Sequence, residues 1–302
     1  MLELLTRAGC FVAIIVLGIV LRRIGFFKEG DFALLGKISL RITLPAAIVT
    51  SFADKTIDPA LLTIALLGLG MGLLCMGVGY VTHLKKPKPH QAFAVLNLSG
   101  CNVGAFTIPF LQTFLGSGAV VVASLFDVGN AAIGLGTSYG IALSIRDGKG
   151  FSWKRIGKAL SRSVALMTYI AMVILTLLKI RLPQPVLDLA GIVGSANTFV
   201  AMLMIGVGFH LTANKSQLGK LLKLILIRYS IGAVLAVSFW YLLPFDLLVR
   251  QTMVILALSP IISAAPAFTG ELEGDVGLSS AFNSICIVIS MVLYVSLLSV
   301  ML

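Results

Sequence analysis

The chain has 302 residues, of which 58% are apolar and only 12% are charged, and its formal net charge is +11. Apolar runs of about 20 residues recur from end to end, which is typical of an integral membrane protein and leaves no room for a soluble domain. A basic excess in a soluble protein would suggest a nucleic-acid partner. Here the placement of the charges along the chain argues against one.

Ten apolar segments predict ten membrane-spanning helices. The first follows Glu3 and Arg7 and continues through Leu21 without a small-residue cleavage pattern, so we interpret it as a span and not as a signal peptide. The predicted spans are residues 4–24, 32–53, 58–83, 91–115, 119–145, 158–180, 184–211, 217–243, 248–270 and 276–300.

Lysine and arginine gather after the odd-numbered spans, as at Arg22 and Arg23, at Lys85 and Lys86, and around the gap that follows Arg146. The loops after the even-numbered spans carry far fewer. By the positive-inside rule the odd-numbered loops face the cytoplasm. We therefore predict a multi-pass protein of the plasma (cytoplasmic) membrane with both termini outside.

The longest polar interruption, "RDGKGFSWKR" at residues 146–155, divides five spans from five. An odd number of spans in each half gives the second half the opposite orientation, so residues 1–145 and 156–302 are predicted to form an inverted repeat joined by a short cytoplasmic loop. Residues 108–132 can be laid over residues 265–288. Pro109 then meets Pro266, and with one gap Asp127 meets Asn283.

Proline at equivalent positions of the two halves predicts two broken helices, in spans four and nine. A proline inside a helix leaves backbone groups without partners, which hydrocarbon tolerates only where they are buried in protein or line a polar cavity. Broken helices that cross near the midplane would offer both ends of the helix dipole to a small ion or an anionic solute. Pro45 stands alone in span two, where a simple kink is expected.

Three motifs carry a family resemblance. "NVGAFTIP" (102–109), "LPAAIVTSFAD" (44–54) and "LALSPIISAAPAFTGELEGD" (256–275) resemble the auxin efflux carrier family, which includes plant PIN-type carriers and bacterial homologues. The resemblance covers the whole chain, with a much shorter central loop than in the plant carriers. It implies a fold like that of bile-acid symporters and sodium/proton antiporters, with spans 1, 2, 6 and 7 as a scaffold and the others as a transport domain. It also implies a homodimer joined through the scaffold.

The resemblance places the substrate-facing asparagine at Asn102 and the crossover prolines at Pro109 and Pro266. An amide both donates and accepts, so Asn102 suits a carboxylate, although it could instead cap the half-helix after the break. Ser263, in the third motif, is assigned to the same site. Asn197 and Thr198 in span seven are expected to close the pocket from the scaffold side.

Charges inside the spans are costly unless they are paired or functional. Lys37 and Arg41 are explained by snorkelling near the end of span two, and Arg228 is similar but deeper. Asp127 has no nearby basic residue in sequence, so we predict that it binds the coupling ion. Asn130 and Asn283 are assigned to the same role. The alternative is a permanent ion pair between Asp127 and Arg228 or Lys37.

The predicted function is a secondary transporter that moves a small organic anion by alternating access. A sodium- or proton-coupled symporter of a larger, bile-acid-like anion is the alternative. A membrane enzyme is disfavoured because the sequence has no H-E-x-x-H, paired intramembrane aspartates or P-loop, and a channel because one crossed site offers no pore. Cys10, Cys75, Cys101 and Cys286 suggest packing and no metal site. No cofactor is expected, coupling to H⁺ or Na⁺ is open, and the expected partners are the anion, the lipid bilayer and a second copy of the chain.

Overall fold

The computed structural model describes residues 2–28, 30–53, 55–56, 58–148, 153–210 and 217–301, which form helices and no strand. Three short segments, η1, η3 and η4, are π-helical and η2 is a 3₁₀ turn. In chain order the elements are α1 (Leu2–Arg23), α2 (Asp31–Ile38), η1 (Ser39–Thr43), α3 (Leu44–Phe52), η2 (Pro59–Leu62), α4 (Thr63–Val81), α5 (Lys88–Ser99), η3 (Val103–Thr107), α6 (Ile108–Phe114), α7 (Ser117–Ala132), η4 (Ile133–Thr137), α8 (Ser138–Asp147), α9 (Trp153–Ser161), α10 (Val164–Leu177), α11 (Gln184–Ser195), α12 (Asn197–Val207), α13 (Leu218–Leu242), α14 (Leu247–Ala257), α15 (Ala265–Glu271) and α16 (Val276–Met301).

Within these residues, seven helical stretches are long and apolar enough to cross a membrane. Three shorter apolar helices, Val103–Phe114, Val164–Leu177 and Leu247–Ala257, fall in the fourth, sixth and ninth predicted spans. Large apolar side chains point outward along the long helices, as at Leu66 (67% exposed) and Val234 (67% exposed). Such an exterior suits lipid, so the prediction of an all-helical membrane protein is confirmed.

The sixth predicted span differs from the expectation of one continuous helix over residues 158–180. The amphipathic helix α9 ends at Ser161, and α10 starts anew at Val164. Ser163 separates them because its hydroxyl accepts a hydrogen bond from the Leu166 amide, at 3.3 Å, as an N-cap. The predicted loop 146–155 is also shorter, since α8 continues through Asp147 and α9 begins at Trp153, with residues 149–152 outside the described part.

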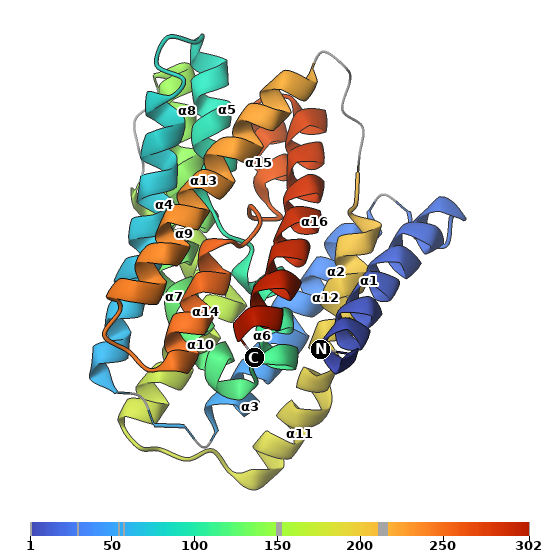
Figure 1. Ribbon diagram of the computed structural model, residues 1–302, viewed down its shortest axis with the longest axis vertical. Coiled ribbons are helices and arrows are strands. Elements are labelled where there is room, and N and C mark those ends of the chain that lie inside the picture. Colours follow the sequence, from blue (N-terminus) through green and yellow to red (C-terminus); the bar gives the residue numbers. More distant parts are fainter. Residues whose placement is uncertain are drawn as a thin grey trace.

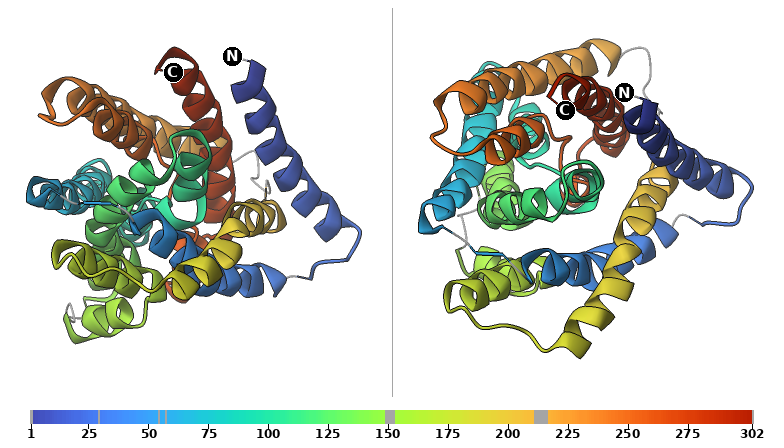
Figure 2. Two further views of the ribbon diagram at one scale, coloured as in Figure 1. Left: turned by 90° about the horizontal axis from the view of Figure 1, so that it is seen from below. Right: turned by 60° about the horizontal axis from the view of Figure 1, so that its bottom comes forward.

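Contacts between helices fall mainly into two sets (Figures 1 and 2). In one set α12 packs against α1 and α2, and α3 packs against α10 and α11. In the other set α4 packs against α5 and α7, α5 against α8, α13 against α14, and α15 against α16. The two sets meet where α3 and α10 contact α7, so the centre of the molecule lies between them.

Glycine permits the closest of these approaches. A Cβ atom on Gly68 of α4 would lie 2.1 Å from the carbonyl oxygen of Phe126, and one on Gly129 of α7 would lie 1.9 Å from that of Ala65. Because neither distance is sterically allowed, α4 and α7 can pack at this separation only with glycine at both positions. Small residues at helix contacts are the usual means of close packing in membranes.

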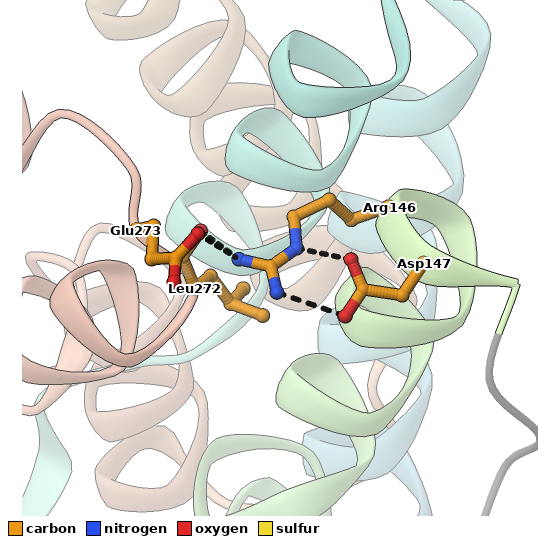
Figure 3. A network of polar contacts seen from close by, with 4 residues as sticks. All are labelled: Arg146, Asp147, Leu272 and Glu273. Atoms are coloured by element: carbon orange, nitrogen blue, oxygen red, sulfur yellow. Dashed lines mark hydrogen bonds and ion pairs between the residues drawn. The ribbon is translucent and has the colours of Figure 1, made fainter.

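Hydrogen bonds join several loops at one end of the molecule. Arg22 donates to the Val207 carbonyl at 3.0 Å, Lys223 to the Thr82 carbonyl at 3.2 Å, and Arg146 to the Leu272 carbonyl. Arg146 also lies between Asp147 and Glu273 (Figure 3). The described residues that follow predicted spans one, three, five and nine therefore share an end with Val207, near the end of span seven, and we call it the basic end. α1 begins and α16 ends toward the opposite end (Figure 1).

Candidate functional site

Two helix breaks cross each other in the middle of the molecule. α5 ends at Ser99 and α14 ends at Ala257, and the non-helical residues 100–102 and 258–264 that follow pass each other in antiparallel fashion at the Cys101–Ile261 bridge. The backbone N–H of Asn102 donates to the Pro260 carbonyl at 2.9 Å, and the backbone N–H of Ile262 donates to the Gly100 carbonyl at 3.2 Å. Backbone groups that the broken helices leave without partners thus satisfy one another, as a membrane interior requires.

The prolines do not make these breaks themselves, contrary to the sequence-based expectation. Pro266 is the second residue of α15, the half-helix that follows the second break, whereas Pro109 lies inside the helix Val103–Phe114 that η3 and α6 form after the first break. A first-turn proline such as Pro266 costs no hydrogen bond because its missing N–H has no intrahelical partner there. Before Pro109 the chain widens into the π-helical turn η3, in which the Thr107 amide donates to the Asn102 carbonyl at 3.1 Å.

Arg228 of α13 stabilises the crossing through hydrogen bonds from its buried side chain. Its side chain is only 1% exposed, and its guanidinium donates to the carbonyl oxygens of Leu98 (3.2 Å) and Ser259 (2.7 Å). It also contacts the thiols of Cys75 (3.4 Å) and Cys101 (3.1 Å). Snorkelling is therefore the wrong explanation for Arg228. A fixed cation stands where the carbonyl ends of α5 and α14 converge, which is where helix dipoles favour positive charge.

Three hydroxyl groups form a second set of hydrogen bonds at the crossing. Thr107 Oγ1 lies 2.8 Å from Ser259 Oγ and 3.0 Å from Tyr294 Oη, and Tyr294 donates to Ser259 at 3.0 Å. All three residues are buried. They tie η3, the break after α14 and helix α16 together, so this side of the crossing is held as firmly as the side that Arg228 contacts.

A cavity of about 460 Å³ adjoins the crossing and lies between the two sets of helices. Its walls are mostly apolar, and its polar side chains come from five separate parts of the chain. The polar and charged residues that line it are Arg41, Asn102, Asp127, Asn130, Arg162, Ser163, Tyr169 and Ser263. A mostly apolar cavity of this size with a few converging polar groups is the usual form of a small-molecule site.

Asn102 and Ser263 meet at the edge of the crossing that faces the cavity. Asn102 Nδ2 donates to Ser263 Oγ at 2.6 Å, so one residue from each broken segment contributes to the same polar pair. Asn102 precedes η3, but its side chain makes no capping hydrogen bond. The alternative role of Asn102 as a side-chain cap is therefore wrong, and the residue instead lines the cavity.

Asp127 forms the other polar group of the cavity, together with Asn130 and Tyr169. Its carboxylate accepts from Asn130 Nδ2 at 2.7 Å and from Tyr169 Oη at 3.0 Å. The side chain of Asn130 also binds the interrupted backbone. Its Oδ1 accepts a hydrogen bond from the Cys101 N–H and its Nδ2 donates one to the Cys101 carbonyl, both at 2.9 Å. Asn130 therefore connects Asp127 to the crossing through hydrogen bonds.

The predicted alternative of a permanent ion pair between Asp127 and Arg228 or Lys37 is wrong. The guanidinium of Arg228 is occupied by two carbonyls and two thiols, and among the described residues no ion pair joins Asp127 to either cation.

Five predicted site residues are absent from the lining of the cavity: Pro109, Pro266, Asn197, Thr198 and Asn283. Asn197 is fully buried, and its amide oxygen accepts from Thr43 at 2.9 Å, which joins α12 to η1. Thr198 follows it and does not line the cavity, and neither does Asn283 of α16, whose amide oxygen is buried without a partner. Leu40, Leu44 and Met204 line the cavity on the side where Asn197 and Thr198 were expected.

Sequence reasoning missed Tyr169 as a site residue and assigned only snorkelling to Arg41. Arg162 was counted only as part of a cytoplasmic charge cluster. Tyr169 contacts Asp127 from 42 positions away, so no local spacing could reveal the pair. A signal was present for Arg162, because it stands two turns before Tyr169 in an otherwise apolar segment.

Comparison with known proteins adds no identification. No family model matches this chain, and no curated protein matches it. Among the residues that the structure describes, no group of three or more His, Cys, Asp or Glu side chains is placed to hold a metal ion. The fold and the site define the chain as a helical membrane protein with a polar cavity beside two crossing, interrupted helices.

Proposed function

We propose that this protein is a secondary transporter that moves a small organic anion across the plasma membrane by alternating access, as a relative of the auxin efflux carriers. The observation that carries the proposal is the cavity of about 460 Å³ beside the crossing of the two broken segments. Interrupted helices that cross in a membrane and line a cavity are a recurrent device of secondary transporters. The proposal also assigns ten membrane spans to this chain, arranged as two inverted repeats of five spans each.

The polar groups of the cavity favour an anion with an apolar body. Arg41 and Arg162 add two positive charges to the lining, and the Asn102–Ser263 pair adds neutral donors beside the start of η3. A carboxylate would receive hydrogen bonds from these donors, and the arginines would attract it from solution. Asp127 adds a carboxylate that can hold a proton or a cation, so coupling to H⁺ or Na⁺ is assigned to it.

The arrangement of the cavity supports an inward-open state. Its lining includes the first turns of α2 and the residues that begin α10, both of which follow segments of the basic end, as well as residues 101–105 and 262–264 at the crossing. If the basic end faces the cytoplasm, the cavity opens inward and both termini lie outside. Transport then requires the helices that carry the crossing to move relative to α1, α2, α3, α10, α11 and α12. We assign the homodimer contact to that second group.

Reconstitution into liposomes tests this function. Purified protein should accelerate uptake of a radiolabelled monocarboxylate or dicarboxylate from a panel, and the accumulated solute should be chemically unchanged. A thermal-shift screen of the same panel identifies the anion, because a ligand that binds only the folded state raises the unfolding temperature. Chemical conversion of the solute would instead identify an enzyme, and conductance without saturation would identify a channel.

A further inference from the structure

A second cavity, of about 640 Å³, lies at the basic end and shares no lining residue with the cavity at the crossing. Three segments enclose it: the turn between α4 and α5, the first turns of α13, and the turn between α15 and α16. Its lining residues are His83, Lys86, Pro87, Pro89, His90, Phe93, Gly219, Lys220, Lys223, Leu224, Glu273, Gly274, Asp275 and Leu278. Five of these side chains are basic.

The two acidic side chains of this cavity are engaged elsewhere. Asp275 caps α16, accepting from the Leu278 amide at 2.9 Å, and its other oxygen accepts from Gln217 Nε2 at 2.6 Å. Glu273 lies 3.9 Å from the guanidinium of Arg146 (Figure 3). In the described part of the chain no ion pair joins Lys86, Lys220 or Lys223 to a carboxylate. The three lysines of the cavity therefore outnumber its two carboxylates, and among the described residues none of the three is ion-paired with either carboxylate.

The surroundings of His83 show how close together the basic side chains of this cavity lie. His83 stands two residues beyond the end of α4, and its ring Nδ1 lies 3.0 Å from the Gly79 carbonyl oxygen. Partial burial lowers the pKa of His83, and repulsion from Lys223, His90 and Lys86 lowers it further. Lys223 is held nearby, donating to the Thr82 carbonyl at 3.2 Å. An anion placed among these groups would relieve their mutual repulsion.

Apolar side chains surround the same cavity. Phe93, Leu224 and Leu278 form part of its wall. The adjoining outer faces of α4 and α13 expose Val81 (62%) and Leu222 (58%). Inorganic phosphate needs no such surface, whereas a phospholipid needs both a basic pocket for its headgroup and an apolar surface for its acyl chains.

We propose that this cavity binds the phosphate-bearing headgroup of an anionic phospholipid, with Lys86, Lys220 and Lys223 as its charge partners. The lipid bridges the α4–α5 turn and the start of α13, which come from different halves of the chain. Its acyl chains lie along the exposed apolar faces of α4 and α13. This site is independent of the proposed transport function.

The test compares thermal unfolding of the purified full chain in detergent with added phosphatidylglycerol, phosphatidylcholine or sodium phosphate at equal ionic strength. Phosphatidylglycerol should raise the unfolding temperature of the wild type more than phosphatidylcholine does. The triple variant K86Q/K220Q/K223Q should lose that difference. The control K85Q/K88Q/K154Q removes the same charge from the basic end but outside the cavity, and it should keep the difference.

Equal loss in the two triple variants would overturn the proposal, because the effect would then come from the general charge of the basic end. Stabilisation by sodium phosphate alone, with no added effect of phosphatidylglycerol, would overturn the assignment to a lipid. The single variant Lys220→Gln, at an exposed position, gives the same comparison with a smaller expected shift if the triple variant fails to fold.

Discussion

The guanidinium of Arg228 lies 2.7 Å from the carbonyl oxygen of Ser259, at the point where the backbone leaves α14. The same group binds the carbonyl of Leu98 in the last turn of α5, so one side chain holds the ends of both broken helices. In this arrangement the positive charge at the crossing belongs to the protein and is always present.

Replacement of Arg228 by methionine should destabilise the fold. The side chain is fully buried, and its loss leaves two carbonyl oxygens without donors, at about 1–3 kcal/mol each. We expect a clear fall in the unfolding temperature in detergent. Arg181→Met, an exposed arginine, is the control and should have little effect. An unfolding temperature of Arg228→Met equal to that of the control would show that the crossing does not depend on this cation.

Two glycines on the same helix allow a matched test of the α4–α7 contact. Gly68→Ala places a methyl group 2.1 Å from the Phe126 carbonyl, whereas an added methyl group at Gly70 meets nothing within 4 Å. We expect Gly68→Ala to cost about 1–3 kcal/mol through overpacking and Gly70→Ala to be neutral or slightly stabilising. Thermal unfolding of both variants measures the difference. Similar values for the two would mean that α4 and α7 shift apart at no cost.

Apolar run length predicted the seven long apolar helical stretches of the described residues, because a helix that crosses a membrane needs about 20 apolar residues. The positions of the breaks were predicted less well. Proline lies in the half-helix that follows each break, but the chain leaves helical geometry earlier, at Gly100–Asn102, where hydrogen bonds to residues 260 and 262 replace helical ones. That pairing depends on a segment about 160 positions away, which no local pattern reports.

Only part of the site was predicted, because here too some of its contacts join segments that are far apart in the sequence. Asn102, Ser263, Asp127 and Asn130 stand close to the breaks in sequence, and the structure brings them to one cavity. Tyr169, Arg41 and Arg162 join them only through the packing of other helices. Asn197 was chosen for its polarity, but a buried amide can serve packing equally well, as its hydrogen bond from Thr43 shows.

Asn102→Ala should weaken anion binding while the protein stays folded. The amide lines the cavity and makes no side-chain cap, so its removal takes away a donor and leaves η3 intact. Loss of one hydrogen bond to a carboxylate should raise the Kd about tenfold or more. Ligand titration by thermal shift measures it, with Thr198→Ala as a control outside the cavity. Unchanged affinity would remove Asn102 from the site, and loss of folded protein would assign it a structural role.

The two cavity arginines should govern capture of the anion. Arg41→Gln and Arg162→Gln should each lower the uptake rate at low ionic strength, and the effect should shrink as salt screens the charges. Lys37→Gln is the matched control, because it removes the same charge one turn away on the same span but outside the lining. Equal effects of Lys37→Gln and Arg41→Gln would attribute the change to surface charge and not to the cavity.

Asp127→Asn should separate substrate binding from ion coupling. A carboxylate inside the hydrocarbon layer is costly unless it is protonated, paired or bound to a cation, and among the described residues its hydrogen-bond donors are the neutral groups of Asn130 and Tyr169. Asparagine keeps the shape and an acceptor for Tyr169 but cannot titrate. We expect the variant to bind and exchange the anion with less than about a tenfold change in Kd.

The same variant should lose accumulation driven by a pH or sodium gradient in proteoliposomes, and the gradient that drives the wild type identifies the coupling ion. Tyr169→Phe is the companion variant, because it removes one hydrogen bond to the carboxylate and leaves the titratable group in place. It should shift the pH dependence of transport without abolishing coupling. If Asp127→Asn liposomes still accumulate the anion at the wild-type rate under a gradient, the carboxylate is a structural acceptor for Asn130 and Tyr169, and the coupling ion binds elsewhere.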